Sequence, residues 1–114
     1  MLPLERTALL EIIRYSDGRR FLLHAAVVMD DHVHTLVTPD ESNTLESIIR
    51  NWKACGAARL RRTRCAPFWQ RGYFDRIVES PREFIIKLRY IEMNPARRWP
   101  ECGSYAWIWV RGKQ

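Results

Sequence analysis

The first hydrophobic positions of the chain recur with the spacing of an amphipathic helix. Between residues 4 and 15 the apolar side chains share one face: Ala8, Leu9, Ile12 and Ile13. Gly18 follows, and glycine suits the backbone that ends a helix. The pattern then becomes extended, with one apolar run at residues 21–29 and a second at residues 32–38, after the acidic pair Asp30-Asp31. Two such runs around a tight turn predict a β-hairpin.

The middle of the chain predicts a second helix. Asn43, with Glu46 three positions later, matches a helix cap. The apolar stripe that follows consists of Leu45, Ile48, Ile49 and Trp52. Beyond this helix, residues 72–78 predict a short strand.

A third helix should begin at Ser80, where a serine cap precedes Pro81 and Glu83. It should stop near Asn94, because Pro95 disfavours helical backbone before it. Residues 99–114 show no clear period, and we assign their tryptophans to the core. Helices with a mainly antiparallel sheet predict an α+β fold, with residues 1–114 as one domain.

Composition adds that the protein is globular. Hydrophobic residues make up 46% and charged residues 28% of 114 residues, which is not a disordered mixture. No apolar run approaches the length needed to span a bilayer, and the first residues lack a signal-peptide pattern, so we expect a cytoplasmic protein without a membrane partner. Three cysteines without CxxC spacing favour neither a disulfide framework nor a zinc knuckle.

The charge pattern favours a nucleic-acid partner. Nineteen Lys and Arg against thirteen Asp and Glu give a net charge of +6. Around Phe68 and Trp69 lies a basic cluster that we expect to contact DNA: Arg50, Lys53, Arg59, Arg61, Arg62, Arg64 and Arg71. The two aromatic residues have two interpretations, base stacking or burial in the core, and burial is favoured.

The His32-Val33-His34 triplet is the most informative local feature. On a strand both imidazoles project to one face while Val33 enters the core, so the pair can hold a metal ion. The alternative is a chance pair on a solvated edge. Leu36 takes the next position on that face, which argues against a hydrolase of the HxHxH kind. Two histidines still require a third ligand.

Tyr90 and Asn94 lie four apart on the third predicted helix and therefore share a face. The apolar stripe of that helix is Phe84, Ile85, Leu88 and Ile91. Tyr90 lies about 150° and Asn94 about 110° from its centre. Tyr90 is then either a boundary tyrosine or a nucleophile whose phenol attacks phosphorus beside a cation held by His32, His34 and Asn94.

Three segments resemble those of a known family in the same order. Residues 25–37 resemble the histidine strand of the small insertion-sequence and REP-associated tyrosine transposases, which are single-tyrosine HUH endonucleases. Residues 68–75 are similar to their tryptophan-containing loop, and residues 88–95 to their nucleophile helix. The resemblance implies a ferredoxin-like HUH fold, although the family's first strand is missing before the first helix here.

The resemblance also implies an activity and its partners. His32, His34 and Asn94 would bind Mg²⁺ or Mn²⁺, and Tyr90 would form a 5′-phosphotyrosine on single-stranded DNA, often next to a hairpin. A homodimer is implied as well. Two other functions stay open: an inactive, truncated remnant that only binds DNA, and a metal-dependent phosphoesterase that uses activated water.

Overall fold

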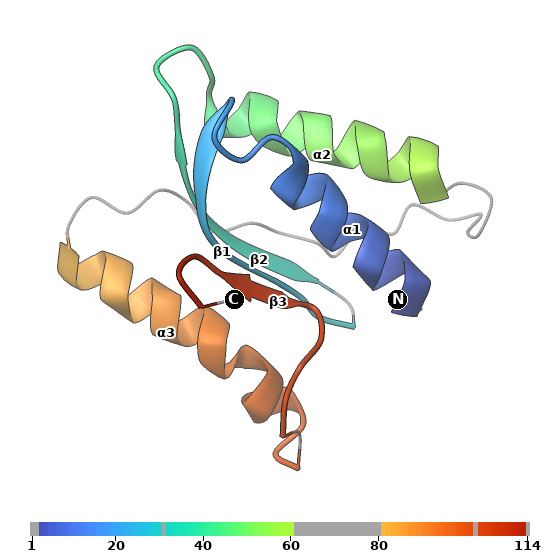
Figure 1. Cartoon of the computed structure of the whole chain (residues 1–114), viewed down its shortest axis with the longest axis vertical. Helices are drawn as coiled ribbons and strands as arrows, with labels where there is room; N and C mark the ends of the chain where they lie inside the picture. Colours follow the sequence, from blue (N-terminus) through green and yellow to red (C-terminus); the bar gives the residue numbers. More distant parts are fainter. Residues whose placement is uncertain (1–2, 31, 61–80, 102, 114) are drawn as a thin grey trace.

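The computed structural model describes residues 3–30, 32–60, 81–101 and 103–113. Along this part of the chain the elements are α1 (Pro3–Tyr15), β1 (Phe21–Val28), β2 (Val33–Pro39), α2 (Leu45–Leu60), α3 (Pro81–Arg98) and β3 (Ile108–Val110). The antiparallel sheet separates two helical layers, with α1 and α2 on one face and α3 on the other (Figure 1). The predicted α+β class is confirmed. The strand predicted at residues 72–78 lies outside the described residues.

The predicted apolar stripes of α1 and α2 are the faces that pack into a shared core. Leu9 and Ile13 of α1 and Ile48 and Trp52 of α2 are buried in one core. The cap of α2, however, is Thr44 and not Asn43. Thr44 Oγ1 accepts the Ser47 N–H at 3.1 Å, and Ser47 Oγ accepts the Thr44 N–H at 3.2 Å. Asn43 instead donates to Asp40, 2.7 Å away, which draws it out of the cap position.

The hairpin of β1 and β2 contains an irregularity that changes which residues face each layer. Leu23 pairs with Val37, and Ala25 already pairs with Leu36, so His24 is the extra residue of a bulge. Leu23 packs in the α1–α2 core while Ala25 packs toward α3, although both positions are odd. The bulge therefore explains why Leu23 and Ala25, although two positions apart, face opposite layers.

A third strand, β3, was not predicted. It pairs antiparallel with β1, matching Ala25 with Val110 and Val27 with Ile108, so the sheet order is β2-β1-β3 (Figure 1). From Trp107, just before β3, to Val110 the side chains alternate between the layers: Trp107 and Trp109 pack against the α1–α2 core, and Ile108 and Val110 against the α3 core. The tail tryptophans, which were assigned to the core, are partly buried and pack against it, Trp99 on the α3 side.

Helix α3 passes through Pro95, so the prediction that it stops near Asn94 was wrong. The helix continues to Arg98, and the Trp99 N–H donates to the Pro95 carbonyl at 2.8 Å. Proline removes one helical hydrogen bond and costs about 3 kcal/mol in a helix interior. Here Pro95 is buried, and only one turn follows it. Burial of its ring and the bonded last turn offset that cost.

Candidate active site

The two histidines of the HVH triplet lie together beside the hairpin turn. Their ring centroids are 4.7 Å apart, and Val33 between them is buried in the α1–α2 core. His34 lies within β2, with 1% of its surface exposed. His32 lies just before β2, where its carbonyl accepts the Met29 N–H at 2.8 Å and closes the turn. The predicted same-face arrangement of the imidazoles is therefore what the fold produces.

Helix α3 brings Tyr90 to the same place. The Tyr90 and His34 ring centroids are 5.1 Å apart, with the planes near perpendicular at 87°. The contact exists because α3 packs on β1 and β2, on the face to which His34 points. His34 thus contacts both His32 and Tyr90, which are separated by more than fifty positions in the chain.

Asn94 is more buried than its helical position predicted. Its exposed fraction is 8%, whereas Ile85, which we had placed in the apolar stripe, is 53% exposed. The buried residues of α3 are Ile91, Asn94 and Pro95, so Asn94 lies about 50° from the centre of the buried arc rather than about 110°. Tyr90 falls at the edge of this arc and is half-buried. A buried amide one turn from the phenol is suited to a polar site.

An ion pair joins the end of α3 to the hairpin turn. Arg98 Nη2 and Nε donate to Asp30 Oδ2 at 2.8 and 3.3 Å. The hydrogen bond from Arg98 holds the pKa of Asp30 below its ordinary value, so this carboxylate stays ionised. The pair connects the helix that carries Tyr90 and Asn94 to the turn that precedes His32.

The predicted DNA-binding residues divide into two groups. Arg50, Lys53 and Arg59 are exposed on α2, in the layer across the sheet from Tyr90, and Arg59 pairs with Glu11 at 2.8 Å. The remaining four lie outside the described residues: Arg61, Arg62, Arg64 and Arg71. Phe68 and Trp69 lie outside them as well.

Sequence reasoning missed a basic residue beside the phenol. The Arg97 guanidinium carbon lies 5.0 Å from the centre of the Tyr90 ring. The signal was present in the sequence, since seven positions are nearly two helical turns and place both residues on one face.

His24 is the third histidine of the chain, and it stands apart from the pair. Its ring packs edge-on against Phe84 of α3 at 5.0 Å, and a 2.8 Å hydrogen bond joins its Nε2 to Thr38 Oγ1. Burial lowers the pKa of His24 below its ordinary value; the Arg111 guanidinium lowers it further, and Asp17 opposes both. The neutral ring is therefore the form that the fold favours.

We expect His24 to make the fold less stable in mild acid. A folded-state pKa below the unfolded value of about 6.5 means that the unfolded chain takes up the proton first. The contribution of His24 is complete above that value and is lost as the pH falls through the folded-state pKa. Urea unfolding of the wild type and of His24→Gln at a series of pH values from neutral to acidic measures it. The variant should show the shallower pH dependence, and equal slopes would contradict the assignment.

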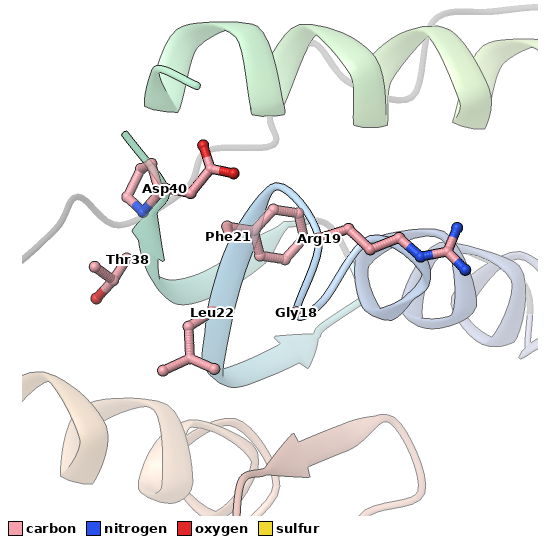
Figure 2. A pocket seen from close by; sticks show the side chains of 7 residues that line it. Gly18, Arg19, Phe21, Leu22, Thr38 and Asp40 are labelled. Atoms are coloured by element: carbon pink, nitrogen blue, oxygen red, sulfur yellow. The ribbon is translucent and has the colours of Figure 1, made fainter. Parts of the chain in front are cut away.

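One pocket formed by described residues lies elsewhere. It has a volume of about 310 Å³, with Phe21 and Leu22 in its wall and Arg19 and Asp40 at its rim (Figure 2). Phe21 pairs with Pro39 at one end of the hairpin, whereas Val28 pairs with Val33 at the end that carries His32. At 3.2–3.4 Å per residue the two ends are about 20 Å apart. The pocket is therefore separate from His32, His34 and Tyr90.

The described residues limit the possible partners in two ways. They contain no group of three or more His, Cys, Asp or Glu placed to hold a metal ion. A metal site in this part of the chain would therefore need a donor of another type, such as the Asn94 amide. None of the helices in the described ranges combines the length and apolarity that a membrane crossing requires.

Comparison with known proteins identifies the family. A family model described as "Transposase IS200 like" matches residues 5–94. This segment is most of the chain, and it contains His32, His34, Tyr90 and Asn94. No curated protein and no solved structure matches the chain. The chain therefore belongs to the IS200-like transposases, small insertion-sequence transposases of the HUH type, and this family places it in DNA transposition.

Proposed function

We propose that this protein cleaves single-stranded DNA and rejoins strands through a 5′-phosphotyrosine on Tyr90. One observation carries the proposal: the His34 ring contacts the His32 ring on one side and the Tyr90 ring on another, at 4.7 and 5.1 Å. Tyr90 packs at the edge of the buried arc of α3, so its phenol does not serve to fill the core. It is well placed to meet a phosphate that approaches the histidine pair.

The donor set fits a divalent cation. His32 and His34 present nitrogen donors from one face, and Asn94 would add an amide oxygen from the buried arc of α3. A mixed set of nitrogen and oxygen donors, completed by water and phosphate oxygens, is compatible with Mg²⁺ or Mn²⁺. When bound, the ion would neutralise charge on the phosphoryl oxygens.

The residues of the chain position the phenol for attack. Helix α3 is held against the sheet by the apolar core around Ile91 and Leu88, and at its end by the Arg98–Asp30 pair. Tyr90 therefore meets the histidine pair without a large rearrangement of the backbone. Tyrosine is suited to strand transfer, because the phosphotyrosine bond conserves the energy of the broken phosphodiester for rejoining.

The test is formation of a covalent adduct. We expect the protein, incubated with single-stranded oligonucleotides and Mn²⁺, to acquire a mass shift on the tryptic peptide that contains Tyr90 and to release a free 3′-hydroxyl. DNA binding without an adduct, unchanged by chelation of the metal, would favour the inactive remnant. Hydrolysis of DNA without an adduct would favour activated water as the nucleophile. The homodimer stays a prediction.

A further inference from the structure

Arg97 occupies a position that the proposed reaction leaves unassigned. It lies in the last turn of α3, seven residues after Tyr90, so the two side chains differ by only about 20° around the helix axis. The guanidinium carbon is 5.0 Å from the centre of the Tyr90 ring, and Arg97 is exposed. An exposed side chain therefore places its cation over the ring of the phenol.

The two neighbouring arginines at the end of α3 have different surroundings. Arg98 forms the ion pair with Asp30, 2.8 Å away, and its guanidinium lies 5.8 Å from the Trp99 ring. Among the described residues Arg97 has no carboxylate partner, and its contact is the face of the Tyr90 ring. A contact of this kind at an exposed site contributes only about 0.5–1 kcal/mol. Arg98 fastens the helix, and Arg97 keeps its hydrogen-bond donors available to a ligand.

We propose that Arg97 is a further catalytic residue, which binds the scissile phosphate of single-stranded DNA above Tyr90. This inference rests on the proposed function and adds to it the group that recognises the reacting phosphate. Guanidinium offers planar paired donors that match two phosphate oxygens. A phosphate held by this guanidinium can lie beside the Tyr90 hydroxyl, which is the group that attacks it.

The reaction at this phosphate exchanges one phosphate ester bond for another. Tyr90 Oη forms a bond to phosphorus while the bond between phosphorus and the 3′ oxygen breaks. The electron pair leaves with the 3′ oxygen, which takes a proton and becomes the 3′-hydroxyl, and the phenolic proton passes to water. Arg97 donates to the non-bridging oxygens, where negative charge grows in the transition state.

Adduct formation tests the catalytic part of the proposal. Loss of one preorganised donor costs about 10²–10³-fold in rate, so Arg97→Ala should slow adduct formation by about that factor. Free guanidinium at millimolar concentration should restore part of the rate, because it can enter the space that the side chain leaves. A structural role gives no such rescue. The matched control is Arg82→Gln, an exposed arginine about 22 Å away in the first turn of the same helix, which should keep the wild-type rate.

A binding measurement tests the phosphate contact without any turnover. Each phosphate contact to a single strand contributes about 0.7 to the slope of log affinity against log salt. Fluorescence anisotropy with a labelled single-stranded oligonucleotide should show that slope reduced by about 0.7 in Arg97→Ala and unchanged in Arg82→Gln. An unaltered slope together with an unaltered rate overturns the role of Arg97 while leaving the tyrosine chemistry intact. Absence of adduct in the wild type rejects the proposed function, and the salt slope still decides whether Arg97 binds phosphate.

Discussion

Replacing Tyr90 by phenylalanine should abolish the covalent DNA adduct. The substitution removes one oxygen and keeps the ring that packs on His34 at 5.1 Å and under Arg97 at 5.0 Å. Without that oxygen no other atom of the residue can bond to phosphorus, so the rate should fall by about 10⁴-fold or more, as when other enzymes lose their nucleophile. Denaturing gel electrophoresis of protein with labelled oligonucleotide measures it directly.

The fold of this variant should be intact. A half-buried hydroxyl at the edge of a core contributes little, and we expect unfolding free energy to change by less than about 1 kcal/mol. Tyr15→Phe is the matched control, because Tyr15 is 76% exposed at the end of α1, in the other layer. It should form adduct at the wild-type rate. Persistence of the adduct in Tyr90→Phe would falsify the assignment of the nucleophile.

Removal of either histidine of the pair should eliminate tight Mn²⁺ binding. Loss of a residue that hydrogen-bonds to a metal ligand lowers metal affinity by about 10–100-fold, so loss of the ligand itself should lower it by about 100-fold or more. His32→Ala suits the half-buried position beside the turn, and His34→Phe keeps an aromatic ring in a position that is 1% exposed. Isothermal titration with Mn²⁺ detects binding whether or not the protein cleaves DNA.

The third histidine gives this experiment an internal control. His24→Ala removes an imidazole that is engaged with Thr38 and Phe84 at the bulge of β1. Mn²⁺ affinity should be unchanged in this variant. If all three variants weaken binding equally, Mn²⁺ binding is not specific to the histidine pair, and the site built on His32, His34 and Asn94 is rejected.

The sequence predicted the parts of the fold that depend on local periodicity. The hairpin and the apolar faces of α1 and α2 follow from spacing that is repeated over several turns or a whole strand. The same-face placement of His32 and His34 depends only on the alternation of a strand, and the structure has it. These features required no knowledge of distant contacts.

The features that sequence reasoning missed depend on contacts between distant segments. Strand β3 has three residues without a period of its own and exists because β1 offers an edge to pair with. Ile85 is exposed and Asn94 is buried, the reverse of what we expect from the sequence, because packing on the sheet decides which side of α3 is buried. Thr44 rather than Asn43 caps α2 because Asn43 is hydrogen-bonded to Asp40. None of these contacts is visible in a local pattern.

Strand β3 has a consequence for where this fold is complete. The family match ends at Asn94, yet the last strand supplies side chains to the interior of both layers and covers the outer edge of β1. Two hydrogen bonds reinforce the contact between this tail and β1. The Tyr105 hydroxyl donates to the Val28 carbonyl at 2.6 Å, and the Val28 N–H donates to the Trp107 carbonyl at 2.9 Å. A fragment cut at the limit of family similarity would retain His32, His34, Tyr90 and Asn94 but would lose Arg97. It would also lack the strand that shields both cores from solvent. The segment that defines the family is therefore shorter than the segment that is needed to fold.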